Sequence, residues 1–237
     1  MYGNEKEVGL AIKKSGVARE KLYITTKYDG SVQPLDIAES FALSLKTLDL
    51  EYVDQYLIHD PFFANGSAKA LQDAWVVMES ILASGKARTI GVSNFLQKDL
   101  EAVLETAKVI PAINQIEYHP YLQHGDLIAF HKKNGIATSA YSPLTAVTKA
   151  SPGPLDGTYE ALAKKYGVTT GDVALRWVID QGIVALTTST NEDRLKGYQK
   201  VGLFKLTPKE VEDIRITGLE KNFRGFWADK FAADDFN

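Results

Sequence analysis

Residues 53–93 contain one strand–helix–strand unit, and this unit decides the fold class. Val53-Asp54-Gln55-Tyr56-Leu57-Ile58 is a strand candidate, and Thr89-Ile90-Gly91-Val92-Ser93 is a second one. Between them, Ser67–Ala83 has the pattern of a helix, and Gly85 follows it at the position of a helix stop. Repetition of such a unit is typical of an α/β protein with a parallel sheet or a barrel.

The same alternation extends in both directions along the chain. The apolar runs are nearly continuous, as in strands that are buried on both faces of a parallel sheet. The other expected strands are Leu22–Thr26, Ala112–Glu117, Ala137–Ser142 and Ile183–Thr187, and the other expected helices are Leu35–Leu48, Gln97–Thr106, Gly125–Lys133, Thr158–Tyr166, Thr169–Gln181 and one that starts at Thr207-Pro208-Lys209-Glu210. Periodicity alone leaves an open doubly wound sheet and a (β/α)8 barrel that lacks two strands equally favoured. Ala150–Gly157, which is rich in turn formers, is expected to be a surface loop.

Composition and charge exclude several classes of protein and partner. The chain has 237 residues, of which 45% are hydrophobic, a net charge of -3 and no cysteine. A single domain over residues 1–237 is expected, with neither a nucleic acid nor a membrane as partner. No apolar run reaches the roughly 18 residues of a membrane span, and no secretory signal is present, so a cytoplasmic location is expected. No metal-binding motif occurs, so no metal site is expected.

Polar residues follow the expected strands, at the point where each strand ends. Active sites of β/α barrels are built at the carboxyl ends of the strands. The chain has neither a Rossmann glycine motif nor a P-loop, so these strand ends are the remaining candidates for a functional site. They carry Lys27, His59, Ser93, Asn94, Gln115, Glu117, Tyr141, Ser142, Thr188 and Ser189.

Six segments of the chain, in order, resemble signature segments of the aldo-keto reductase superfamily. They are Met1-Tyr2-Gly3-Asn4-Glu5, Ile24-Thr25-Thr26-Lys27, Leu57-Ile58-His59-Asp60-Pro61, Gly91-Val92-Ser93-Asn94-Phe95, Asn114-Gln115-Ile116-Glu117-Tyr118-His119-Pro120 and Ala140-Tyr141-Ser142-Pro143-Leu144. The resemblance implies a (β/α)8 TIM-type barrel that lacks its first strands, with about six present. It also implies NADPH-dependent reduction of an aldehyde or ketone, a small-molecule carbonyl substrate, and a monomer if the chain is complete.

The resemblance also implies roles for individual residues. Tyr2 would be the general acid that protonates the carbonyl oxygen, and Lys27 would lower the pKa of its phenol from the usual value near 10. His59 would orient the carbonyl and hydrogen-bond to its oxygen. The residues that match cofactor-binding positions for NADPH or NADP+ are Ser93, Asn94 and Gln115 at the nicotinamide carboxamide, Tyr141 on the nicotinamide ring, Ser142 and Leu144 at the pyrophosphate, and Thr188, Ser189 and Arg194 in the segment of the 2′-phosphate.

Some segments depart from the common pattern of this superfamily. Thr187-Thr188-Ser189 stands where many members have Pro-Lys-Ser, and it resembles a fungal branch that reduces conjugated polyketones, ketopantoyl lactone and α-keto amides. Substrates such as α-dicarbonyls, α-keto lactones or α-keto amides are therefore implied. The family has an Asp five positions before the catalytic Tyr, whereas only Met1 precedes Tyr2. The alternative interpretation is an incomplete family member with impaired catalysis that retains at most nucleotide binding.

The C-terminal tail and three histidines complete the expectations. The segment from Asn222 to the terminus is rich in aromatic residues, and it is expected to dock on the barrel, either as a lining of the substrate pocket or by simple packing. His119 is expected to position a loop. His124 and His131 are expected at the surface.

Overall fold

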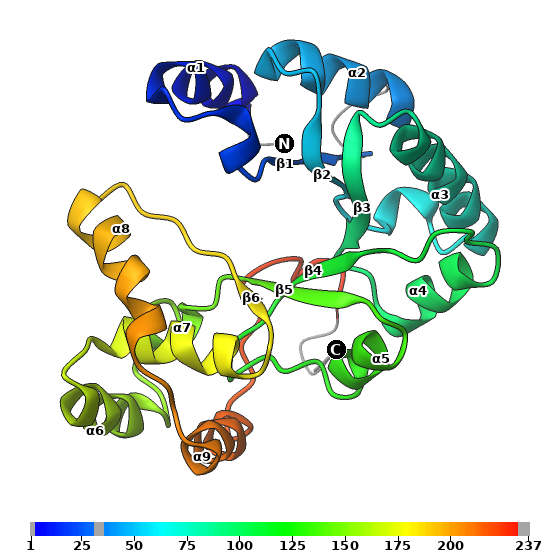
Figure 1. The fold of residues 1–237 in the computed structure, drawn as a ribbon. Helices are drawn as coiled ribbons and strands as arrows, with labels where there is room; N and C mark the ends of the chain where they lie inside the picture. The colour runs from blue at the N-terminus through cyan, green and yellow to red at the C-terminus, as the bar shows by residue number, and fades with distance from the viewer. Residues whose placement is uncertain (1–2, 31–35, 232–237) are drawn as a thin grey trace. The chain divides into compact units, whose positions relative to one another are not determined.

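The computed structural model describes residues 3–30 and 36–231, and their contacts form two compact units. Unit 1 comprises residues 1–114 and 134–136, and unit 2 comprises residues 115–133 and 137–237. Each unit combines strands with helices that cover them (Figure 1). The α/β class is confirmed, and the described residues contain six strands. The expectation of a single domain over residues 1–237 stays a prediction.

Unit 1 begins the sheet with parallel strands in chain order. β1 (Thr25–Tyr28) pairs with β2 (Val53–Ile58), and β2 pairs with β3 (Ala87–Ser93). A hydrogen bond from the Ala112 amide to the Ile90 carbonyl, 2.9 Å, leads into β4 (Ile113–Glu117). The helices of this unit are α1 (Glu5–Ser15), α2 (Ile37–Leu48), α3 (Ala68–Ala83) and α4 (Gln97–Leu104), with short 3-10 turns η1 (Arg19–Lys21) and η2 (Phe62–Ala64).

Local sequence signals and packing explain where these helices form. Asp36 and Ser67 accept hydrogen bonds from amides in the first turns of α2 and α3, which is the usual role of an N-cap side chain. Trp75 of α3 is buried, and its indole N–H donates to the Val109 carbonyl at 2.9 Å. This contact fixes α3 against the segment that leads into β4.

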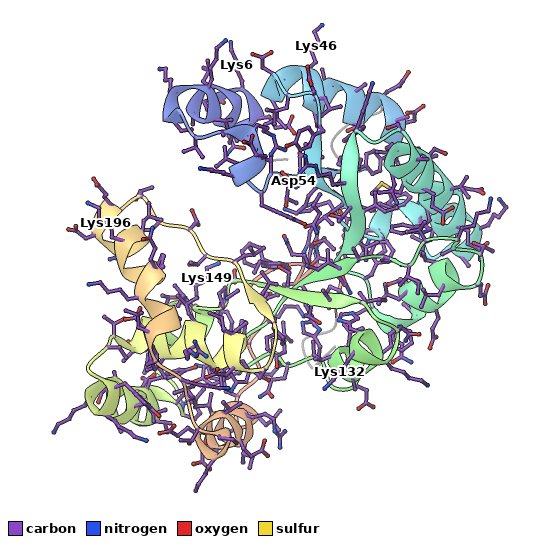
Figure 2. The ribbon with its side chains drawn as sticks, in the orientation of Figure 1. Lys6, Lys46, Asp54, Lys132, Lys149 and Lys196 are labelled. Atoms are coloured by element: carbon purple, nitrogen blue, oxygen red, sulfur yellow. The ribbon has the colours of Figure 1, made fainter. Side chains whose placement is uncertain are left out.

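A buried carboxylate ties the strands of unit 1 together. Asp54 of β2 contacts the Arg19 guanidinium at 2.8 Å and accepts a hydrogen bond from the Ile24 amide at 2.9 Å. Arg88 of β3 reaches the same carboxylate at 3.4 Å. Figure 2 shows Asp54 among the strands, whereas Lys46 points away into solvent. The buried charge is therefore paired, which is the condition for its being tolerated there.

Unit 2 contains the end of β4, then β5 (Ala137–Tyr141) and β6 (Val184–Ala185). The Tyr118 amide donates to the Tyr141 carbonyl at 3.3 Å, and β5 and β6 are parallel. The helices are α5 (Leu127–Lys133), α6 (Asp156–Tyr166), α7 (Thr170–Asp180), α8 (Glu192–Tyr198) and α9 (Pro208–Gly218), with 3-10 segments η3 (Thr145–Val147) and η4 (Gln199–Leu203). As expected, Thr207 and Glu210 form a capping box at the start of α9.

Several boundaries differ from the expected ones. Lys27 lies inside β1 instead of after the strand, and β6 has two residues instead of the five of Ile183–Thr187. Ala150–Gly157 is only partly a surface loop, because Ala150 and Leu155 are buried and α6 begins at Asp156. The helices α1 and α8 are not predicted from the sequence. Gly9 is the one buried residue of α1, and α8 buries none, so neither helix has a wide apolar face. No helix in the described ranges is long and apolar enough to cross a membrane.

The expectation that His124 and His131 lie at the surface is wrong. Both side chains are buried, and each has a polar partner inside unit 2 that makes the burial of its ring nitrogens tolerable. Nε2 of His124 lies 2.5 Å from the Glu117 carbonyl oxygen, and Nδ1 of His131 lies 2.9 Å from the Thr138 hydroxyl. Burial lowers the pKa of each ring from 6.5 to about 4.

The pKa of His131 predicts a loss of stability in mild acid. Because this pKa is lower in the folded chain, the unfolded chain binds the proton first as the pH falls. Stability is therefore present above pH 6.5 and declines toward pH 4. By linkage, His131 should cost about 2 kcal/mol of unfolding free energy between pH 7 and pH 4.5.

Urea unfolding at both pH values checks this expectation. His131→Gln removes the titrating ring and should lose less stability than the wild type over the same interval. The control is Lys132→Gln, on an exposed neighbour in α5 that Figure 2 labels. An equal acid loss in His131→Gln and the wild type would contradict the assignment.

Candidate functional site

A cavity of about 330 Å³ lies in unit 1, beside the carboxyl ends of β1 and β2. Its lining includes Lys27 of β1, Asp29 directly after β1, His59 directly after β2, and Glu5 from the first turn of α1. Thr26 donates to the Glu5 carboxylate at 2.6 Å, which ties the start of α1 to β1. Two of the expected catalytic residues, Lys27 and His59, therefore line one cavity. Tyr2 lies outside the described residues.

Lys27 has an unusual environment for a lysine. It lies in β1 opposite Leu57 of β2, and its neighbour Tyr28 is buried. Burial lowers the pKa of the Lys27 ammonium group from its usual value. A lysine held at this cavity is suited to act on the charge of a neighbouring group.

His59 is held at the end of β2 by its backbone and faces two carboxylates. Its amide donates to the Tyr28 carbonyl at 2.8 Å, which extends the pairing of β1 and β2 by one residue. Nδ1 of the ring lies 3.4 Å from the Asp29 carboxylate and 3.7 Å from the Asp60 carboxylate, and all three side chains are buried. These acceptors favour a hydrogen on Nδ1 and restrict the orientation of the ring.

Opposing effects act on the protonation of His59. Burial and the charge of Lys27 lower the pKa of the ring to about 4, while Asp29 acts in the opposite direction. Asp29, His59 and Asp60 also present ligand-type atoms within 4.8 Å of one another. Because Lys27 lines the same cavity as His59 and Asp29, its charge works against a bound cation, and we interpret the two carboxylates as partners of the ring.

Ser93 and Asn94, at the end of β3, are buried next to the His59 backbone. The Asn94 amide nitrogen donates to the His59 carbonyl at 2.9 Å and to the Ser93 hydroxyl at 3.1 Å. Asn94 has a φ of +60°, a left-handed conformation that costs energy in a residue other than glycine. Such conformations concentrate at functional sites.

Unit 2 presents a second group of expected site residues, after β5. Tyr141 ends β5 with its ring partly exposed, and Ser142 has a φ of +55°. Thr145 donates its amide at 3.1 Å and its hydroxyl at 2.9 Å to the Ser142 carbonyl, which closes a tight turn around Leu144. Gln115 is buried in the part of β4 that belongs to unit 2.

The segment after β6 presents hydroxyl groups and a guanidinium group. Thr188 and Arg194 are exposed, and Ser189 is partly exposed. The Ser189 hydroxyl accepts from the Asn191 amide at 3.0 Å, and the Asn191 side chain accepts from the Arg194 amide at 3.0 Å. Hydroxyl and guanidinium donors are the chemistry that a phosphate group requires, so these residues fit the phosphate of a nucleotide.

Sequence reasoning missed two residues that shape these sites. Asp29 is not among the predicted site residues, although it stands two positions after Lys27 at a strand end. Glu117 was noted only as a strand-end residue, yet its carboxylate holds the C-terminal segment of unit 2 through the amides of Gly225 and Phe226. Asp29 belongs to the same strand-end pattern as Lys27, whereas the two amides that the Glu117 carboxylate binds are more than 100 positions away.

Comparison with known proteins gives consistent matches. The model of the aldo/keto reductase family matches residues 1–218. An NAD/NADP-dependent indole-3-acetaldehyde reductase of Schizosaccharomyces pombe is 33% identical over 95% of this chain and 80% of its own length. An NADPH-dependent alpha-keto amide reductase of Saccharomyces cerevisiae is 35% identical over 96% of this chain and 76% of its own length.

Solved structures agree with these relatives. An aldo-keto reductase from a deep-sea metagenome library of the Medee basin matches with a TM-score of 0.85 and 34% identity, covering 94% of this chain and 80% of the other. An aldo-keto reductase of Bombyx mori, solved in complex with NADP, matches with a TM-score of 0.82 and 33% identity, covering 91% of this chain and 75% of the other. The expected barrel relationship is therefore confirmed.

Proposed function

The chain belongs to the aldo/keto reductase family, and on that premise we propose that it reduces the carbonyl group of small aldehydes or ketones with NADPH. The observation that carries the proposal is the cavity of unit 1, where Lys27 and His59 meet at the ends of β1 and β2. Support for α-keto amides, α-keto lactones or α-dicarbonyls comes from Thr187-Thr188-Ser189 and from the relative named as an alpha-keto amide reductase.

The proposed proton-transfer residues are Tyr2, Lys27 and His59. Bound NADPH would supply the hydride. Tyr2 would give its phenolic proton to the carbonyl oxygen, and the Lys27 cation would make that proton easier to release. His59 would orient the oxygen, and negative charge developing there would raise the pKa of the ring, in the same direction as Asp29. Asp29 and Asp60 would hold the ring at Nδ1.

The proposed cofactor residues are those that match the family's cofactor-binding positions. Ser93, Asn94 and Gln115 would bind the nicotinamide carboxamide, and Tyr141 would stack on the ring. The donor chemistry of the segment after β6 supports phosphate binding there. Its residues are Thr188, Ser189 and Arg194, while Ser142 and Leu144 are proposed at the pyrophosphate. A monomeric chain in the cytoplasm, without a nucleic acid partner, is part of the same proposal.

The proposed function is tested by NADPH oxidation with a small α-dicarbonyl. The purified chain should turn over, and Tyr2→Phe should reduce kcat by about 10²–10⁴, because the proton donor at the carbonyl oxygen is lost. Tyr23→Phe is a matched control, since Tyr23 is a largely exposed tyrosine two residues before β1. Full activity in Tyr2→Phe would refute the role of Tyr2.

The same assay decides between the proposal and its alternative. If the wild type does not turn over, NADPH fluorescence on titration with the protein measures nucleotide binding alone. Binding without turnover would favour the alternative of a catalytically impaired family member.

A further inference from the structure

Lys221 holds the loop that connects η3 to α6 in unit 2. Its ammonium group donates hydrogen bonds to the Ala150 carbonyl at 2.5 Å and to the Pro152 carbonyl at 3.0 Å. It also lies 5.3 Å from the centroid of the Tyr121 ring, within the range of a cation–π contact. Because a hydrogen bond from a charged donor is stronger than one between neutral groups, Lys221 fixes the backbone on both sides of Ser151.

The Tyr121 hydroxyl is a second support of the same loop. Tyr121 is buried, and its hydroxyl oxygen accepts a hydrogen bond from the Leu155 amide at 3.1 Å. A Cβ atom on Gly153 would lie 2.5 Å from this oxygen, closer than a carbon and an oxygen can approach without displacement. Ala150 and Leu155, at the two ends of the loop, are buried as well. The loop is therefore packed into unit 2 in a defined conformation.

This support continues to the turn after β5 through backbone hydrogen bonds. The Ala150 amide donates to the Thr145 carbonyl at 2.9 Å, and the Thr145 amide and hydroxyl donate to the Ser142 carbonyl. Ser142 has a φ of +55°, a conformation that persists in a residue other than glycine only where its surroundings hold it. Lys221, the loop and this turn form one continuous path of hydrogen bonds, and every residue of the path belongs to unit 2.

We propose that Lys221 is a positioning residue for dinucleotide binding, because its ammonium group holds the turn from Ser142 to Thr145 in the conformation that receives the pyrophosphate. The inference rests on the proposed function, in which Ser142 and Leu144 contact the pyrophosphate. In this role Lys221 acts through the loop and makes no contact with the ligand. A turn that is already ordered loses less conformational entropy when the ligand binds, so the affinity for a dinucleotide depends on Lys221. Ligands without a pyrophosphate do not gain from the ordered turn.

Hydrogen exchange measures the hold on the loop without any ligand. In Lys221→Met, which keeps an apolar stem and removes the ammonium group, the amides of residues 148–156 should exchange about tenfold faster than in the wild type. Tyr121→Phe removes the acceptor of the Leu155 amide without changing a charge, and it should accelerate exchange in the same segment. Lys164→Met, on an exposed lysine of α6, is the control for a lost charge and should exchange like the wild type.

Binding of two nucleotides measures the effect on the turn. In Lys221→Met and Tyr121→Phe, the Kd for NADPH, measured by its fluorescence, should rise about tenfold, since the turn must then be ordered on binding. Lys221→Arg, whose guanidinium group can donate to the same carbonyls, should stay within about threefold of the wild type. Adenosine 2′-monophosphate carries the 2′-phosphate but no pyrophosphate, and its Kd, measured by calorimetry, should be unchanged in all of these variants.

The outcomes separate the loop, the turn and the cofactor. Wild-type exchange rates in Lys221→Met would overturn the hold on the loop, and Lys221→Gln decides in its place if that variant does not fold. Faster exchange with an unchanged Kd for NADPH, or with an equal rise in Kd for both nucleotides, would overturn the positioning role. A wild type that does not bind NADPH would refute the cofactor part of the proposed function and the positioning role with it. Because the binding measurements do not require turnover, failure of carbonyl reduction alone would refute only the proposed reaction.

Discussion

Lys27→Met should reduce kcat for carbonyl reduction by about 10²–10⁴ while the chain stays folded. The proposed proton donor, Tyr2, has a phenol whose ordinary pKa is near 10, so it releases its proton slowly at neutral pH unless a cation is close. Lys27 lines the cavity at the end of β1 and is the proposed source of that charge. Methionine keeps the length and apolar character of the side chain and removes the ammonium group.

Two measurements separate loss of chemistry from loss of structure in Lys27→Met. Burial lowers the pKa of Lys27, which means that its charge is costly in the folded chain. The midpoint of thermal unfolding should therefore not fall in the variant, and NADPH should still bind. Lys13→Met, on an exposed lysine of α1, should leave kcat unchanged. Wild-type turnover in Lys27→Met would show that the reaction does not use this charge.

Trp177→Ala should lower the free energy of unfolding by about 3–5 kcal/mol, the usual cost of removing a large buried side chain. Trp177 of α7 has no exposed surface, and its ring stacks on Tyr118 with centroids 5.4 Å apart. Its indole N–H donates to the Val211 carbonyl of α9 at 3.0 Å. The substitution therefore removes contacts with the end of β4 and with α9 together, and leaves the Val211 carbonyl without this donor.

Urea denaturation followed by circular dichroism measures the effect. Trp177→Phe keeps an aromatic ring on Tyr118 and loses the N–H group, so it should cost less than Trp177→Ala. Ile179→Ala, in the same helix at a position that is 38% exposed, should cost under about 1 kcal/mol. Equal costs for Trp177→Ala and Ile179→Ala would contradict the assignment of Trp177 to the core of unit 2.

Regular elements with a buried face could be predicted from the sequence. β2 has the expected bounds, Val53–Ile58, and every residue of it is buried, including the polar residues Asp54 and Gln55. The capping box at Thr207 predicted the start of α9, because it depends only on residues three positions apart. The helices α1 and α8 are not predicted because they bury almost nothing. The predicted strand is longer than β6 because the apolar residues Ile183 and Leu186 flank the two residues of β6.

For the candidate site too, some features can be predicted from the sequence and others require the tertiary structure. The α/β class follows from the alternation of expected strands and helices. The family follows from short motifs in order along the chain, and the roles expected of Lys27 and His59 are implied by that resemblance. Only the tertiary structure decided that Asp29 faces the His59 ring, that His124 and His131 are buried, and that Glu117 binds the amides of Gly225 and Phe226. Each of these depends on which distant groups meet, and a sequence pattern carries the order of neighbours along the chain but not the partners that folding brings together.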